Sequence, residues 1–423
     1  MTRTPIDLII HNAKQLVTVR GYTQHAATGP EMEDLGILED GAVGIANGKI
    51  IAVSKTDEIL TNYDAPHKID AKGKIVTPGL IDAHTHFIFA GSREAELEMK
   101  IKGAKYLEIL EKGGGILRTV RDTRAATKDD LLQSCRKRAN ELLTHGTTTI
   151  EAKSGYGLDL RTEIKMLEVI NSLNDEGPLS LVSTFLGAHA IPPEFERNVD
   201  GYVELICNNW LPEIQERHLA TFCDVFCEKG VFEIEESRRI LLAGKQFGLM
   251  PRIHADELYP LGGAELAAEV GAVSADHLLF ASAAGMEQMN RARVIATLLP
   301  AAPLTLMMDR YADARSFITK RIPVALGSDL SPSCWLVNHQ LVLALACYKM
   351  GMTPAEAFMA ATINAAHSIR RAGEVGSIET GKKSDIVIFD APDYRFLAYR
   401  LGMNLVDTVV KDGKVVVRDG RLE

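Results

Sequence analysis

The sequence predicts an α/β fold, a (β/α)₈ TIM barrel that carries a small β-sandwich domain formed by both chain termini. Residues 77–374 alternate between apolar strand-like runs and helix-like segments, which favours a parallel sheet with crossover helices. Residues 1–76 and 375–423 have a different sequence pattern, which is typical of short paired strands. A doubly wound open sheet is the alternative, but its glycine-rich phosphate loop is missing after the first strand. We therefore expect a composite sandwich domain, 1–76 plus 375–423, and a barrel domain, 77–374.

The two ends of the chain are expected to meet in that sandwich. IDLIIHN, AVGIANGKIIAVS and GKIVTPG near the start alternate or run apolar, with Asn-Gly and Lys-Gly turns. SDIVIFDAP and VDTVVKDGKVVVRDGRLE near the end repeat this pattern, with an Asp-Gly turn at 412–413. Because both ends of the chain are β-rich and the residues between them are not, we predict that the two ends form one small domain together.

The middle of the chain supplies eight candidate barrel strands. Helix-like segments with apolar residues near a spacing of 3.6 separate most of them, for example residues 123–146 and 161–177. The eight runs are LIDAHTHF, TTTIEAKS, LVSTFLGAH, TFCDVFCE, MPRIHADE, AVSADHLL, RVIATLLP and PVALGSDL.

Composition restricts the partners of the protein. Lys and Arg number 47 against 56 Asp and Glu, and this net charge of −9 argues against nucleic acid as the main partner. The start, MTRTPIDLIIHNAK, lacks the apolar region of a signal peptide, and no stretch approaches the ~18 apolar residues of a membrane span. Six cysteines in 423 residues do not make a disulfide framework. We expect a cytoplasmic enzyme that acts on a small molecule, with no membrane partner.

The residues that can carry chemistry follow the candidate strands. His84 and His86 are one residue apart, so in a strand both imidazoles point to the same face. Two unrelated histidines in a core would show the same spacing, but more polar residues occur at the ends of other strands. Active sites of (β/α)₈ barrels lie at those ends, and burying so many polar groups without partners would be costly. The further residues are Glu151, Lys153, Tyr156, His189, His254, Glu257, His277 and Asp329.

Three imidazoles and a carboxylate are a ligand set that suits zinc or iron. A metal of this kind lowers the pKa of a bound water toward ~7 and so makes a nucleophile at neutral pH. Glu257 lies three residues after His254, where it can reach over the open coordination position as a proton shuttle. His277 can orient the water or polarise a carbonyl.

These motifs together resemble the amidohydrolase superfamily in its mononuclear form. PGLIDAHTH, RIHADE, ADHLL and LGSDLSP occur in the family's order, and the likeness covers essentially the whole chain. FAGSREAELEMKIKGAKYLEILEKGGGI, EAKSGYGL and TFLGAHAIPPEF are similar to the imidazolonepropionase family within it. This resemblance implies hydrolysis of a ring C–N bond of 4-imidazolone-5-propanoate to N-formimino-L-glutamate, the third step of histidine degradation. It also implies one metal per subunit, Zn²⁺ or Fe³⁺, and a homodimer.

The resemblance also implies a role for each site residue. Glu257, His277 and the metal ligand Asp329 would be catalytic. The metal would be held by His84, His86, His254 and Asp329. The substrate would be bound by Arg93, Tyr156, His189, Glu257, Ser331, Ser333 and Cys334.

Two of these residue assignments have alternatives. The planar guanidinium of Arg93 matches the carboxylate tail of the substrate, but Arg93 can instead pair with Glu94 or Glu96. Lys153 can be read as the bridging ligand of a two-metal site, although a structural role beside the ligands is favoured because the mononuclear set is complete.

The segment after the metal aspartate departs from the family pattern. It commonly reads Asp-x-Asn-Pro-Gly-Ser or -Thr, whereas here Ser331 replaces the amide and Ser333 the glycine. Carboxylate recognition is therefore less secure than the chemistry. A heterocycle deaminase of the guanine or cytosine type would use the same metal site but release ammonia. A non-catalytic homologue would lack metal ligands that this chain has.

Overall fold

The barrel predicted from the sequence is present, with all eight strands where the apolar runs place them. The structure, a computed structural model, describes residues 3–103 and 114–423, so part of the family-like stretch 89–116 lies outside the described residues. The eight parallel strands are hydrogen-bonded in chain order, and a bridge between Thr85 and Leu330 brings the last strand against the first. The strands are β8 (Leu80–Thr85), β9 (Thr147–Lys153), β10 (Ser180–Ala188), β11 (Phe222–Cys227), β12 (Met250–Ala255), β13 (Ser274–His277), β14 (Ile295–Leu298) and β15 (Val324–Leu326).

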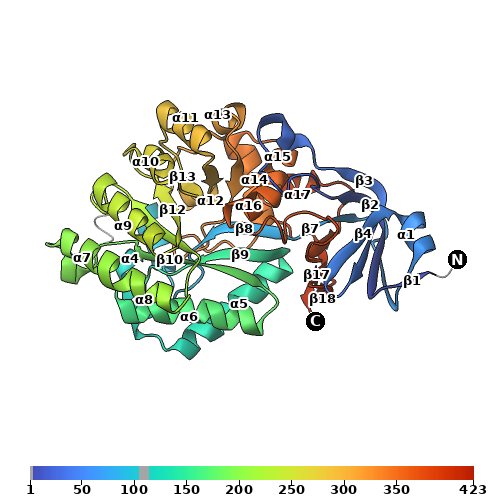
Figure 1. Ribbon diagram of the computed structural model, residues 1–423, viewed down its shortest axis with the longest axis horizontal. Helices are drawn as coiled ribbons and strands as arrows, with labels where there is room; N and C mark the ends of the chain where they lie inside the picture. Colours follow the sequence, from blue (N-terminus) through green and yellow to red (C-terminus); the bar gives the residue numbers. More distant parts are fainter. Residues whose placement is uncertain (1–2, 104–113) are drawn as a thin grey trace.

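Helices lie between the strands on the outside of the barrel (Figure 1). The segment 123–146, expected to be one helix, is the end of one helix and the whole of the next. The chain breaks at Ala126 because Thr127 begins the second helix with a reciprocal capping box to Asp130. The helices up to β12 are α2 (Glu94–Ile101), α4 (Ile116–Ala125), α5 (Lys128–Thr144), α6 (Leu160–Glu176), α7 (Val199–Leu205), α8 (Leu211–Glu216) and α9 (Ile234–Gln246). Those after it are α10 (Gly263–Val270), α11 (Ala283–Ala292), α12 (Ala301–Thr305), α13 (Ala314–Thr319), α14 (His339–Met350), α15 (Pro354–Ala360) and α16 (Ile363–Ser368).

Both ends of the chain join in a second sheet beside the barrel (Figure 1), which confirms the fold class. It is one hydrogen-bonded sheet of nine strands, with the C-terminal strands meeting the N-terminal ones where β16 pairs with β7. The strands are β2 (Leu8–Val17), β3 (Ile37–Ala46), β4 (Lys49–Lys55), β6 (His67–Asp70), β7 (Ile75–Pro78), β16 (Ile386–Phe389), β17 (Val406–Lys411), β18 (Lys414–Arg418) and β19 (Arg421–Leu422). Two short α-helices, α1 (Thr56–Asn62) and α17 (Phe396–Tyr399), a 3-10 helix (Gly29–Glu33) and a strand pair, β1 (Thr4–Pro5) with β5 (Tyr63–Asp64), also lie in these ends. The domain boundary at 76/77 stays a prediction, and strand pairing groups all of β7 with the terminal sheet.

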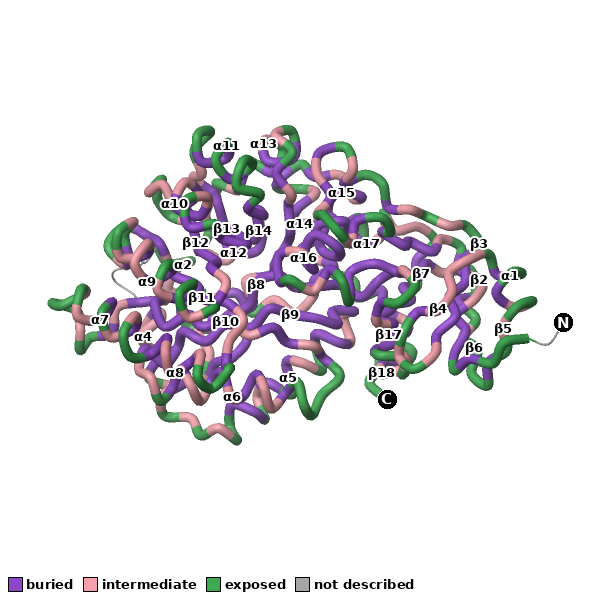
Figure 2. The backbone as a smooth tube through the Cα atoms, viewed as in Figure 1, coloured by how far each residue is buried: buried purple, intermediate pink, exposed green. Residues whose placement is uncertain are grey.

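Burial is deepest in the strands of the barrel (Figure 2). Every residue of β8, β9 and β13 is buried, and so are the polar side chains that end these strands. The terminal sheet has a separate apolar cluster that includes Leu16, Val43 and Ile388. Within the described ranges, no helix is long and apolar enough to cross a membrane.

Candidate metal centre and active site

The first strand of the barrel positions two imidazoles and holds the segment that carries Asp329. The backbone N–H of Asp329 donates to the carbonyl of His84 (3.1 Å), and that of His86 donates to the carbonyl of Leu330 (2.8 Å). Gly327 permits this close approach, because a Cβ there would lie 2.8 Å from the Cβ of His84. Asp329 itself has a φ of 57°, a left-handed conformation that non-glycine residues adopt rarely and mostly where function requires it.

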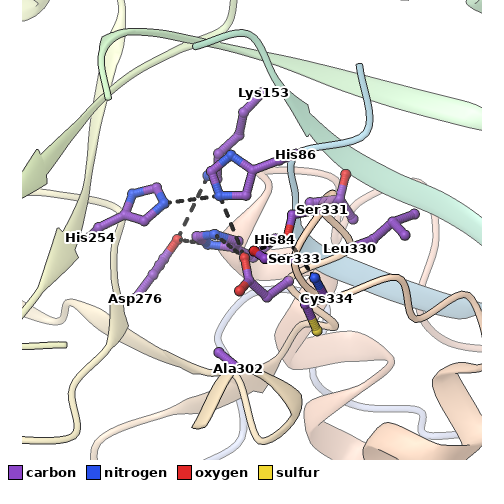
Figure 3. Close-up of polar contacts among 12 residues, drawn as sticks. His84, His86, Lys153, His254, Asp276, Ala302, Leu330, Ser331, Ser333 and Cys334 are labelled. Carbon is purple, nitrogen blue, oxygen red and sulfur yellow. Dashed lines mark hydrogen bonds and ion pairs between the residues drawn. The ribbon is translucent and has the colours of Figure 1, made fainter. Parts of the chain in front are cut away.

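Four side chains predicted as metal ligands converge at the carboxyl ends of the strands. Figure 3 shows the three histidines among them. Nε2 of His84 and Nε2 of His86 lie 3.7 and 3.5 Å from Oδ1 of Asp329. Nε2 of His254 lies 3.3 Å from Nε2 of His86. The ligand atoms of His84, His86 and Asp329 all fall within 4.8 Å of one another, and so do those of His84, His254 and His277. The arrangement has the dimensions of a single-metal site.

Carboxylates behind two of the imidazoles fix their orientation. Nδ1 of His84 contacts Asp276 at 2.6 Å, and Nδ1 of His254 contacts Asp224 at 3.1 Å. An imidazole whose Nδ1–H bonds a carboxylate presents Nε2 as an acceptor, which is the usual arrangement around a metal. In the described part of the chain, the buried Nε2 of His84 has no hydrogen-bond partner. A cation would satisfy that atom, so the donor set fits a metal.

The ionisation of the ligands also suits a cation. Burial and the neighbouring cationic groups lower the pKa of His84 and His86 well below the ordinary value, so both rings are neutral and have a nitrogen lone pair to give. Burial, opposed by His254 and Lys153, raises the pKa of Asp329 to about 7. A metal ion beside Asp329 favours the ionised carboxylate.

Glu257 and His277 form a pair at the edge of the ligand cluster. Oε1 of Glu257 lies 3.6 Å from Nδ1 of His277. Burial first, and then the negative charges of Asp329 and Glu228, raise the pKa of Glu257 well above its ordinary value. Burial and the charge of His254 lower the pKa of His277. A carboxyl group with a raised pKa beside a neutral imidazole is suited to proton transfer near neutral pH.

Two predicted substrate residues lie against the other side of the ligands. The ring of His189 stacks on that of His86, with centroids 4.6 Å apart, and its Nδ1 contacts the carbonyl of Gly155 at 3.0 Å. Burial and the charge of His254 lower the pKa of His189 to about 3, so the ring is neutral. The ring of Tyr156 lies 5.8 Å from that of His86 and 5.1 Å from that of His189. The rings of His189 and Tyr156 therefore lie together beside His86.

Arg93 makes the ion pair that the sequence analysis held as its alternative. Its Nε and Nη2 donate to the two carboxylate oxygens of Glu96 at 2.9 and 2.7 Å. Both side chains are largely buried, 10% and 4% exposed, so this is not a loose surface pair. Glu96 also accepts from the backbone N–H of Gly115. Burial raises the pKa of Tyr156, and the positive charge of Arg93 opposes this, so the guanidinium lies near the Tyr156 ring.

The altered segment after Asp329 is a closed turn. Oγ of Ser331 lies 3.2 Å from Oγ of Ser333 and accepts from the backbone N–H of Cys334 at 3.2 Å. The thiol of Cys334 contacts the carbonyl of Ser328, and burial raises its pKa, so the thiol is neutral. The side chains of this turn bond chiefly to one another.

Asp224 and Asp276, the acidic residues that contact the histidines, were not predicted from the sequence, and Lys153 had two alternative roles. Nζ of Lys153 donates to Glu151 at 2.9 Å and to Asp224 at 2.8 Å, so two of its three N–H groups are engaged by carboxylates. This does not suit the bridging-ligand alternative. A signal was available: Asp224 interrupts the apolar run FCDVFC, and Asp276 directly precedes His277.

Known proteins resemble the chain over its whole length. The Amidohydrolase family matches residues 90–417. The imidazolonepropionase of Geobacillus kaustophilus is 52% identical over 98% of this chain and 99% of its own, and that of Brevibacillus brevis is 51% identical over 98% of both. Among solved structures, a zinc-bound adenosine deaminase from Xanthomonas campestris aligns with a TM-score of 0.75 at 19% identity, covering 100% of this chain and 95% of that one. A triazine hydrolase variant aligns with a TM-score of 0.74 at 18% identity, covering 98% and 96%. At these identities the two structures show the fold alone.

Proposed function

The chain belongs to the imidazolonepropionases within the amidohydrolase family, and from that membership we propose which of its residues perform each part of the reaction. The enzyme is a hydrolase that opens the ring of 4-imidazolone-5-propanoate in histidine degradation. Water adds to the ring carbonyl carbon, the bond from that carbon to the adjacent ring nitrogen breaks, and the nitrogen takes up a proton. The product is N-formimino-L-glutamate.

The ligands of the proposed metal are His84, His86, His254 and Asp329. Their support is the approach of Nε2 of His84 and of His86 to one oxygen of Asp329, and the 3.3 Å that separates Nε2 of His254 from Nε2 of His86. Among the described residues, Nε2 of His84 also has no hydrogen-bond partner. When bound, Zn²⁺ or Fe³⁺ supplies Lewis-acid activation of a water molecule. Zinc and iron both accept imidazole and carboxylate ligands, so metal analysis of the purified protein decides between them.

Glu257 and His277 are the proposed proton-handling pair. Glu257 takes a proton from the attacking water and passes it to the departing ring nitrogen, for which its raised pKa is suited. His277 is neutral, and its remaining N–H can donate to the ring carbonyl oxygen as negative charge develops there.

The carboxylate tail of the substrate is assigned to Arg93. Glu96 binds the edge of the guanidinium formed by Nε and one N–H of Nη2. The other N–H of Nη2 and Nη1 form a second edge, which Glu96 does not contact. A second carboxylate can bind that edge, while Glu96 holds the side chain in place. Tyr156, His189 and the turn of Ser331, Ser333 and Cys334 complete the proposed substrate contacts.

A direct assay tests this function against the deaminase alternative. Purified protein is given freshly generated 4-imidazolone-5-propanoate, and ultraviolet absorbance and ammonia are followed in one sample. We expect absorbance to fall and N-formimino-L-glutamate to accumulate without ammonia. Release of one ammonia per substrate consumed would contradict the proposal.

The compartment and the oligomeric state are proposed from the family resemblance. All six cysteines lie in the described part of the chain and are free, which suits the cytoplasm. We expect a homodimer, and a native mass measurement checks it.

A further inference from the structure

A cluster of five charged side chains lies buried directly behind the three metal-binding histidines. Three carboxylates and two cations occupy it, and each side chain is fully buried. We call it the buried charge cluster, and its members are Glu151, Lys153, Asp224, Arg252 and Asp276. Charges buried this deeply persist only when each is paired, so the geometry of the pairing is tightly constrained.

Lys153 is the shared partner of the carboxylates in this cluster. Its Nζ lies 2.9 Å from Glu151, 2.8 Å from Asp224 and 3.9 Å from Asp276. Figure 3 shows its side chain descending beside His86 toward Asp276. Arg252 supports Asp276 from another side, at 3.0 Å, and donates to the carbonyls of Ala83 and Ser368.

The carboxylates bound by Lys153 are those that orient the metal ligands. Asp224 contacts Nδ1 of His254, and Asp276 contacts Nδ1 of His84. Glu151 accepts from the backbone N–H of Thr85, the residue between His84 and His86. The ammonium group of Lys153 is therefore linked to His254 through Asp224 and to His84 through Asp276. Through Glu151 it is linked to the backbone N–H of Thr85, the residue before His86.

We propose that Lys153 is a positioning residue: through Asp224 and Asp276 it holds Nε2 of His254 and Nε2 of His84 in the orientation that the proposed metal requires. Without its positive charge, the three carboxylates would be left with Arg252 alone, and Asp224 would lose the ammonium group that lies 2.8 Å from it. Residues behind metal ligands typically change metal affinity or activity ~10–100-fold when they are removed. The inference rests on the proposed metal site.

The terminal sheet offers a matched control with the same chemistry and no metal. Lys411 in β17 is also buried, and its Nζ lies 2.9 Å from Asp385. Lys411→Met removes a buried lysine from an ion pair, as Lys153→Met does, but far from the histidines. Loss of stability alone should affect both variants, whereas loss of ligand orientation should affect only Lys153→Met.

Co²⁺ binding to the metal-free protein is the test, with affinity measured by chelator competition and geometry by the visible absorption of the bound ion. We expect Lys153→Met to bind Co²⁺ ~10–100-fold more weakly than wild type, with an altered spectrum, and Lys411→Met to match wild type. Wild-type affinity and spectrum in Lys153→Met, or an equal loss in both variants, would overturn the inference. If wild type itself takes up no Co²⁺, the proposed metal site fails instead.

A double variant keeps the test decisive if Lys153→Met does not fold. Glu151→Gln together with Lys153→Met removes one charge of each sign, which keeps the cluster's net charge unchanged. We expect this protein to fold and still bind Co²⁺ about tenfold more weakly than Glu151→Gln alone. Equal affinity of the double and single variants would overturn the role of Lys153.

Discussion

The proposed metal-binding side of the site and the proposed substrate-binding side are built differently. His84 and His254 lie on barrel strands, and each contacts a carboxylate of another strand: Asp276 of β13 for His84, and Asp224 of the neighbouring β11 for His254. Arg93 lies between strand and helix, at the start of α2, and the turn of Ser331 and Ser333 follows β15. Their side chains bond within their own segments, Arg93 to Glu96 and Ser331 to Ser333.

This difference separates the chemistry of the enzyme from its selectivity. Contacts between strands connect residues that are far apart in sequence, so a change at a metal ligand disturbs the whole centre. Contacts within a loop are local, and loops tolerate substitution. The turn after Asp329 departs from the family pattern while the ligands are retained, as this division predicts.

The largest expected effect is at the metal-binding side. Asp329→Ala or His254→Ala removes a ligand on which the others converge, so we expect bound metal and turnover to be lost together. Metal analysis and the absorbance assay measure both. Asp407→Ala, which removes a carboxylate paired with Lys74 in the terminal sheet, is the control and should keep one metal per subunit. A full metal equivalent with normal turnover in Asp329→Ala would refute the assignment.

Replacing the proton shuttle should reduce turnover while leaving the metal in place. Glu257→Gln keeps the shape and removes the titratable group, and we expect kcat to fall ~10²–10⁴-fold. Steady-state kinetics with metal analysis separates this from ligand loss. Glu356→Gln, at a buried carboxyl group of α15, controls for stability and should leave kcat unchanged. A decrease of less than about threefold would show that Glu257 is not the shuttle.

The same Glu257→Gln variant should make the metal-free protein more stable at neutral pH. Burial raises the pKa of Glu257 in the folded state, so ionisation favours unfolding above the ordinary pKa of 4.5. The stabilisation by Gln should shrink as pH falls through the raised folded pKa and disappear below 4.5. Urea unfolding across this pH range measures it. A wild type that is the more stable of the two at neutral pH would contradict the raised pKa.

The smallest expected effect is in the turn. Ser331→Ala and Ser333→Ala each remove one hydroxyl group from a self-bonded loop, so we expect KM to rise a few-fold, about 0.5–1.5 kcal/mol, with metal content unchanged. Substrate titration of each variant checks this. Loss of metal in either variant would mean that the turn belongs to the metal-binding side.

The fold and the convergence of the histidines were predictable because their signals are periodic and local in sequence. The eight apolar runs correspond to the eight barrel strands, and the alternation in His84 and His86 places both rings on one face. The capping box at Thr127 was visible in the sequence, yet the helical periodicity on both sides of it obscured the break at Ala126.

The rest of the site depends on distant contacts that no local pattern contains. Asp276 and His84 are 192 residues apart, and Lys153 and Asp224 are 71 apart, so the buried charge cluster emerges only when the barrel closes. For Arg93, sequence proximity offered both the substrate and Glu96 as partners, and nothing in the pattern decides between them. The structure contains the ion pair with Glu96. Binding of the substrate tail at the second edge of the guanidinium stays a proposal.

The most direct test of separable chemistry and selectivity compares wild type and Arg93→Ala on two substrates, the natural one and a neutral analogue without the carboxylate tail. Losing a buried charge-assisted contact costs about 2–5 kcal/mol. The kcat/KM for the tailed substrate should fall by the factor that corresponds to this loss of transition-state stabilisation. Glu96→Gln, which loosens the guanidinium but keeps its charge, should lose less. We predict that Arg93→Ala keeps its metal and its kcat/KM for the tail-less analogue. Equal losses for both substrates would show that Arg93 serves the structure of the site rather than recognition, and would contradict the division.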